Sequence, residues 1–249
     1  MKRESGQAAV ESALILPLFV FLLLGILQLG LMHQARLLTK YAAYKAVRAG
    51  ALHNANVDKM ERAALAVLLP LVSQGSSGAE FIKTVNSASD FQAKWNWPGV
   101  TSNQMPDTGI PYVSAVICGP LSSELPSGAQ EVDFDDPSVA ASEDWGQAQR
   151  TKLRIQLTFN YRMPIPFANL TIFNITRARD VPTVLMMGTG EGAPARTFGG
   201  ATPDSDYISA AGGGVYIMPI RATYTMRMQS NLYPQANPLP SSNPCVFSH

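Results

Sequence analysis

The stretch SALILPLFVFLLLGILQLGLM, residues 12–32, contains no charged residue and is leucine-rich on every side of a helix. At a rise of ~1.5 Å per residue, a helix of this length covers a bilayer hydrocarbon core, which is ~30 Å thick. Pro17 lies inside the run, where surrounding lipid favours a kinked helix over a broken one. The stretch therefore predicts a single membrane-spanning helix.

The rest of the 249-residue chain has the composition of a loop-rich, partly β domain. Charged residues make up 15% of the chain, and Gly, Pro, Ser, Asn and Thr are frequent after the apolar run. Roughly 190 residues follow the N-terminal helix, enough for one modest core. The net charge of +1 and the absence of a Lys/Arg cluster argue against nucleic acid as a partner.

The basic residues Lys2 and Arg3 also fit the charged region of a cleaved secretory signal. The apolar run is longer than the usual ~7–15 residues, however, and no Ala-x-Ala-like cleavage site ends it. A retained anchor is therefore favoured. The charge pattern bears on the orientation of this anchor. Four basic residues follow the span, and by their count the C-terminal side would lie in the cytoplasm. They are Arg36, Lys40, Lys45 and Arg48.

Apolar residues continue at helical spacing after the span and predict one continuous helix from about residue 8 to residue 52. Small residues in its second half permit close helix packing. The four bases also fit an amphipathic helix lying on the membrane surface, and the two interpretations are compatible. The small residues are Ala42, Ala43, Ala46, Ala49, Gly50 and Ala51.

The N-terminus carries a second pattern, a short basic leader that ends in Gly6. The uncharged residues 7–10, the acidic Glu11 and then the apolar helix follow it. This order resembles the class III signal sequence of the type IV pilin superfamily. Residues 6–52 closely resemble the N-terminal segment of TadE-like proteins, the minor pseudopilins of tight-adherence (Tad) pilus systems.

The resemblance implies that a prepilin peptidase cuts after Gly6 on the cytoplasmic face, so that Gln7 becomes the first residue and Glu11 the fifth. It thereby places the C-terminal domain outside the cytoplasm, against the charge count. An unpaired carboxylate drawn into the bilayer costs up to ~3 kcal/mol, so Glu11 is expected to pair with the new α-amino group of a neighbouring helix. Ser12 departs from the aromatic residue common in the family. By position alone, Glu11 equally fits an interfacial residue that reaches water.

Alternating apolar residues predict an antiparallel sheet with one buried and one solvent-exposed face. The expected strands are 112–118, 151–163 and 220–229. In the second strand the face expected to be exposed is Lys152, Arg154, Gln156, Thr158, Asn160 and Arg162. In the third strand the face expected to be buried is Ile220, Ala222, Tyr224, Met226 and Met228.

A second helix is expected from about Val57, after cap candidates Asn54 and Asn56, with Pro70 ending or bending it. Residues 79–97 are ambiguous between a short helix and a strand. Loops are expected at 98–111, 120–149 and 188–214, and an extended tail at 233–249.

The two cysteines, Cys118 at a strand end and Cys245 in the tail, predict a disulfide that ties the tail down. Closing this loop stabilises the fold by up to ~4 kcal/mol. It also requires an oxidising compartment, which supports export of the domain. Two free buried thiols are the alternative.

No catalytic or cofactor site is expected. The three histidines, His33, His53 and His249, lack metal-ligand spacing, and the glycines 212–214 lack the Lys-Ser/Thr of a phosphate-binding loop. A further acidic group lacks the spacing of a calcium-binding loop: Asp133, Asp135 and Asp136.

The sequence therefore predicts an α+β protein of the bacterial inner membrane, with a leader at 1–6, a helix at 7–52 that spans at about 12–32, and a periplasmic domain at 53–249. Expected partners are other pilin-like or pseudopilin subunits, the pilus assembly platform, prepilin peptidase and membrane lipid. The alternatives are a signal-anchored extracytoplasmic enzyme or binding domain, and a membrane-anchored adhesin unrelated to pili. Whether the protein enters the pilus fibre is left open.

Overall fold

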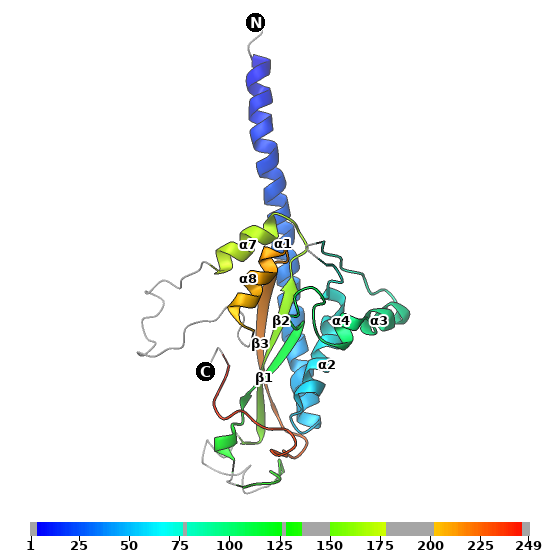
Figure 1. Ribbon diagram of the computed structural model, residues 1–249, viewed down its shortest axis with the longest axis vertical. Helices are drawn as coiled ribbons and strands as arrows, with labels where there is room; N and C mark the ends of the chain where they lie inside the picture. The colour runs from blue at the N-terminus through cyan, green and yellow to red at the C-terminus, as the bar shows by residue number, and fades with distance from the viewer. Residues whose placement is uncertain (1–3, 77–78, 126–127, 136–149, 178–201, 246–249) are drawn as a thin grey trace, which may run out of the picture.

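The computed structural model describes residues 4–76, 79–125, 128–135, 150–177 and 202–245. A long N-terminal helix projects at one end and packs at its other end along a three-stranded antiparallel sheet (Figure 1). Shorter helices surround the sheet. The predicted α+β fold class is therefore confirmed.

Helix α1 (Glu4–Leu52) is continuous, with Pro17 inside it. It ends where Asn54 and Ala55 adopt the left-handed conformation, with φ of 56° and 58°. The amide of Ala55 donates to the carbonyl of Gly50 at 2.9 Å, which satisfies one of the last helical carbonyls. The predicted C-terminal end of the helix is thus confirmed.

Helix α2 (Val57–Leu68) begins at one of the predicted cap residues. The side chain of Asn56 accepts a hydrogen bond from the amide of Lys59 at 3.0 Å. Pro70 lies in η1 (Leu69–Leu71), one turn of 3₁₀ helix that ends α2. The buried face of α2 consists of Met60, Ala64, Leu65 and Leu68.

The sheet has the order β1 (Val113–Gly119), β2 (Lys152–Arg162) and β3 (Ile217–Arg227). Both strand pairs are antiparallel, and the three strands were predicted at these positions. The apolar face of β2 is buried, as its alternation predicts: Leu153, Ile155, Leu157, Phe159 and Tyr161.

The second half of α1 lies in the core beside β2 and α2. Its alanines Ala42, Ala43 and Ala46 are fully buried. A Cβ atom added at Gly50 would lie 2.6 Å from the sulfur of Met60, so the helix and its neighbour need a glycine there to approach this closely. This half of the helix therefore packs within the domain and does not lie alone on a membrane surface.

The expectation that the other face of β2 is exposed to solvent is wrong for its second half. Gln156, Thr158, Asn160 and Arg162 are only 4%, 4%, 1% and 2% exposed. Helix α8 (Asp204–Gly212) contributes to this covering, because its Tyr207 hydroxyl donates to the side-chain oxygen of Asn160 at 2.7 Å. This helix lies where the sequence predicts a loop.

Three further elements differ from the predictions or resolve them. Residues 88–95 form α3 (Ala88–Trp95), whereas α4 (Pro98–Thr101) lies in the predicted loop 98–111 because Pro98 suits the first turn of a helix. The turn η2 (Ser122–Glu124) lies in the predicted loop 120–149. No element was predicted for the stretch that forms α7 (Ala168–Arg177).

Tyr224 of β3 is also an exception, since it was expected on the buried face and is 43% exposed. It lies on an edge strand, where its ring contacts Tyr44 of α1 with centroids 5.4 Å apart.

The described part of the tail is only partly extended, because it begins with a turn in which the amides of Ala236 and Asn237 donate to the carbonyl of Tyr233 at 3.0 Å and 2.9 Å. Pro240 accepts a hydrogen bond from the amide of Ser122 at 2.9 Å, which holds the tail beside the end of β1. The long predicted loops 120–149 and 188–214 are described only in part, because residues 136–149 and 188–201 lie outside the described residues.

Candidate functional site

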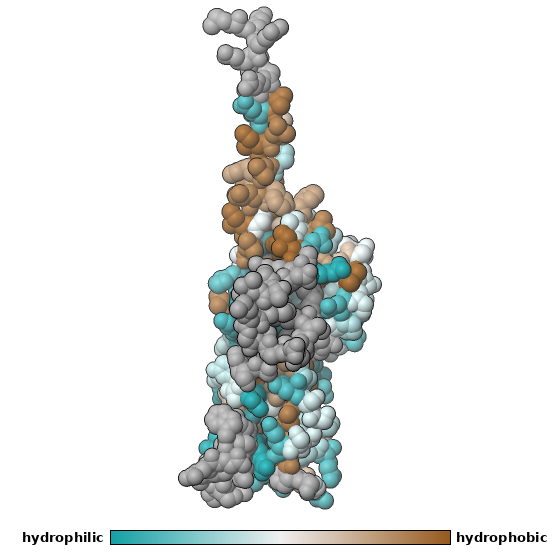
Figure 2. All heavy atoms as spheres, turned by 90° about the vertical axis from the view of Figure 1, so that its left-hand side faces the viewer, coloured by the Kyte–Doolittle hydropathy of each residue, from teal (hydrophilic) through white to brown (hydrophobic). Residues whose placement is uncertain are grey.

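The most distinctive surface is the projecting part of α1, from Val10 to Leu27. Its Leu, Ile, Val and Phe side chains are 42–71% exposed, Leu24 excepted. Figure 2 shows this part as an almost uninterrupted apolar column above the domain. In the part of the chain that the structure describes, this is the one helix long and apolar enough to cross a membrane.

Gln28 marks the point where the projecting helix meets the domain. It is fully buried, and its side-chain oxygen accepts a hydrogen bond from the amide of Ile165 at 3.1 Å. It also lies beside Tyr161. Burial raises the pKa of the Tyr161 hydroxyl to about 12, and the polar contact with Gln28 partly opposes this rise. The sequence signal for this role is that Gln28 is the one amide side chain in the apolar run, a signal that the predictions above do not use.

The structure places the predicted processing and docking residues at the outer end of α1. Gly6 and Gln7 are helical in backbone, and Glu11 is exposed. Gln7 and Glu11 are four residues apart along the helix. A further 17 residues separate Glu11 from Gln28, about 25 Å along the axis.

The predicted disulfide between Cys118 and Cys245 is present, with Cα atoms 5.5 Å apart. It joins the end of β1 to the tail across 127 residues of sequence. Because the loop is long, the chain-entropy estimate of its stabilisation is about 4–5 kcal/mol. It lies at the opposite end of the domain region from the projecting helix and serves stability.

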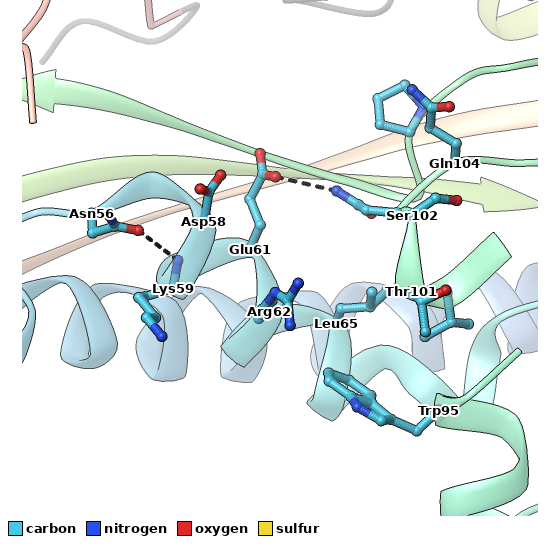
Figure 3. Close-up of a pocket in the computed structure, with 13 residues that line it drawn as sticks. Asn56, Asp58, Lys59, Glu61, Arg62, Leu65, Trp95, Thr101, Ser102 and Gln104 are labelled. Atoms are coloured by element: carbon cyan, nitrogen blue, oxygen red, sulfur yellow. Dashed lines mark hydrogen bonds between the residues drawn. The ribbon is translucent and has the colours of Figure 1, made fainter. Parts of the chain in front are cut away.

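An open groove of about 870 Å³ lies between the start of α2 and residues 95–104 (Figure 3). Its central carboxylate, Glu61, accepts hydrogen bonds from the amide of Ala115 at 3.0 Å and from Asn103 at 3.2 Å. Burial raises the pKa of Glu61, and these two bonds partly oppose the rise. Glu61 thus fastens α2 to the outer edge of β1, a structural role that occupies the group.

A buried ion cluster, not predicted from the sequence, lies at the end of β2. Arg162 contacts Glu80 at 2.7 Å and Asp107 at 2.9 Å, and its side chain is 1% exposed. The pKa of Arg162 is raised because these carboxylates outweigh the effect of its burial. The cluster ties two loops to the sheet. No local pattern could have found it, because the partners are 82 and 55 residues away.

Metal-binding or catalytic groups do not converge among the described residues, where no set of three His, Cys, Asp or Glu side chains could hold an ion. His33 and His53 are 20 residues apart along α1 and the turn after it. Asp133 accepts a hydrogen bond from the amide of Asp135 at 3.0 Å, which is ordinary turn geometry. The third acid of that group, Asp136, lies outside the described residues.

A single exposed apolar helix whose other half forms part of an α+β core fits a membrane-anchored protein in which anchor and domain share one helix. Residues 6–48 match the model of a protein family described as TadE-like protein. The N-terminal helix is therefore TadE-like, which confirms the resemblance over these residues. No curated protein and no solved structure matches the chain.

Proposed function

We propose that this protein is a minor pseudopilin-like component of a Tad-type pilus system, with a structural or priming role in assembly. The observation that carries the proposal is the construction of α1: its first half is exposed and apolar, and its second half is the central helix of the domain. A helix built in this way can leave the bilayer for a bundle of similar helices, taking its domain with it. The family match over residues 6–48 supports the same role.

The proposed orientation has the N-terminus in the cytoplasm and the domain in the periplasm, anchored in the inner membrane. The disulfide between Cys118 and Cys245 supports it, because such bonds persist in oxidising compartments. A reporter that is active only outside the cytoplasm, fused after His249, should therefore be active. Activity only from cytoplasmic reporters would contradict the proposal.

Processing is the second part of the proposal. We expect cleavage after Gly6, so that the mature helix starts at Gln7. N-terminal sequencing of protein from cells with an active prepilin peptidase tests this, with Gly6→Leu as the variant that blocks cleavage. Because α1 packs in the core from Gln28 onward, we propose that the folding unit begins there and not at residue 53.

The partners that follow from this role are other pilin-like or pseudopilin subunits, the assembly platform, the peptidase and membrane lipid. The alternative of an anchored binding domain has the groove beside Glu61 as its best candidate surface. An anchored adhesin would not require cleavage at Gly6. Loss of pili with retained export in the Gly6→Leu variant separates the pseudopilin role from both alternatives.

A further inference from the structure

Helix α7 and the residue before it expose three large apolar side chains. The exposed fractions are 70% for Phe167 at its start, 43% for Leu170 and 58% for Ile175. The helix is fixed to the domain by Ala168 and Phe173, which are each 1% exposed. Helix α7 is therefore held firmly in place while three large apolar side chains remain in contact with solvent.

The backbone conformation of Phe167 is energetically unfavourable. Its φ is 65°, in the left-handed region that aromatic residues rarely adopt. Such a conformation persists only when the surrounding structure enforces it, and it often marks a functional surface. Here Phe167 precedes the first residue of α7, and its carbonyl accepts a hydrogen bond from the amide of Thr171 at 3.2 Å.

The position of α7 indicates what covers the three exposed side chains. The projecting segment from Val10 to Leu27 is about 27 Å long, which nearly fills a hydrocarbon core of ~30 Å. The bilayer surface then lies at the level of Gln28. Since Gln28 binds the amide of Ile165, just before α7, the helix lies at that level beside α1 (Figure 1).

The chemistry of the segment fits an interface between lipid and water. Residues 163–177, MPIPFANLTIFNITR, contain no acidic residue and end in the basic Arg177, which is exposed. An amphipathic helix with aromatic and aliphatic residues on one face and no acid lies stably at the acyl–headgroup boundary. Arg177 suits an anionic headgroup.

We propose that α7 is a second membrane contact, with Phe167, Leu170 and Ile175 inserted into the bilayer interface. The occupant is lipid because α7 lies beside α1 at the level where the projecting helix meets the domain. The contact would fix the tilt of the domain relative to the membrane. The proposal rests only on the membrane anchoring in the proposed function, and not on pilus involvement or cleavage.

The test uses the full chain, with its native disulfide, in nanodiscs that contain phosphatidylglycerol. A single cysteine is introduced by Leu170→Cys and labelled with a polarity-sensitive fluorophore, and Ile175→Cys repeats the measurement at a second exposed position. Leu22→Cys in the projecting segment is the control for lipid. Leu52→Cys, 47% exposed and about 36 Å beyond Gln28 along α1, is the control for water.

We expect spin-labelled lipid to quench the Leu170→Cys and Ile175→Cys labels several-fold more strongly than the Leu52→Cys label. Aqueous iodide should quench them several-fold less. If both labels behave like the Leu52→Cys label while Leu22→Cys is quenched by lipid, α7 faces water and the proposal is wrong, although the anchor stands. Protection from both quenchers would show a protein partner or a second copy and would also overturn it. If Leu22→Cys is not quenched by lipid, anchoring and this proposal both fail.

Discussion

The side-chain oxygen of Gln28 accepts a hydrogen bond from the amide of Ile165 at 3.1 Å, across 137 residues of sequence. This bond joins the start of the packed half of α1 to the stretch that leads into α7. It lies where α1 changes from the exposed projecting segment to the segment that packs in the core of the domain. Gln28 therefore holds the start of the packed half of α1 to the domain through polar contacts with Ile165 and Tyr161.

Replacing Gln28 with Ala should lower the free energy of unfolding by about 1–3 kcal/mol, because a partly buried amide loses its acceptor. Gln34→Ala is the matched control, since Gln34 is exposed on the same helix and should change stability by less than about 0.5 kcal/mol. Denaturant unfolding in detergent measures both. Equal effects would show that the Gln28 contact contributes nothing specific.

Replacing Arg162 with Met should destabilise the domain by about 3–5 kcal/mol, because Glu80 and Asp107 would lose their buried cation. Arg227→Met offers the comparison, since Arg227 lies 4.0 Å from Asp135 and both side chains are more than half exposed. That pair should contribute at most about 1 kcal/mol. Thermal unfolding of the two variants should therefore differ clearly, and similar melting temperatures would refute a role for the cluster.

Replacing both cysteines with serine should cost about 4–5 kcal/mol if the loop-closure estimate holds. Cys118→Ser alone should have nearly the same effect, because either change opens the same loop. Peptide maps of the wild-type protein should contain one cross-linked pair that reduction removes. Two thiols that react with an alkylating agent before reduction would contradict the bond and weaken the argument for export.

Lys94 should make stability depend on pH. Its side chain is buried, and its ammonium donates to the carbonyls of Lys83 at 2.9 Å and Pro70 at 3.3 Å. Burial, with a smaller effect of Lys83, lowers its pKa to about 8 from an ordinary value of 10.5. Between these values the unfolded chain binds more protons, so stability should rise with pH in this window.

The measurement compares wild type with Lys94→Met in denaturant unfolding from pH 7 to pH 10. The wild-type free energy of unfolding should rise relative to that of the variant above about pH 8. Tyr161 and Tyr207, with pKa values raised to about 12, act in the opposite direction above pH 10, and equally in both proteins. Parallel pH curves would show that Lys94 keeps its ordinary pKa.

Replacing Glu11 with Ala should leave membrane insertion intact or improve it, because a charge is removed from the edge of the apolar helix. Pilus assembly should fail if Glu11 pairs with the Gln7 amine of a neighbour. Glu11→Gln is the matched variant, since it keeps the shape and loses the charge. Normal assembly with Glu11→Gln would show that the charge is not needed and return Glu11 to the role of an interfacial residue.

The elements that the sequence predicts well are long or strictly periodic. Helix α1, helix α2 with its Asn56 cap and the three strands all have patterns that extend over several turns or alternations. Helices α7 and α8 do not, because they are short and lie in or beside Gly- and Pro-containing stretches. Periodicity in such short windows does not outweigh turn-forming residues.

The candidate site divides in the same way. Gly6, Glu11 and the two cysteines are visible as local patterns, and the disulfide follows from there being only two cysteines. Arg162 appears in an alternating strand as one more polar residue. Only the fold brings Glu80 and Asp107 to it, so a covered polar face cannot be told from a wet one by alternation alone.

Helix α1 also has a mechanical consequence. It passes from the projecting segment into the core with no linker, and at Gly50 it is pressed so closely against Met60 that a side chain would not fit. Tension applied at the outer end, near Glu11, would therefore reach the sheet directly instead of stretching a flexible joint. The helix and the domain therefore move as one body. In the proposed assembly, an axial displacement of a neighbouring helix bound to the outer part of α1 would move the whole domain by the same amount.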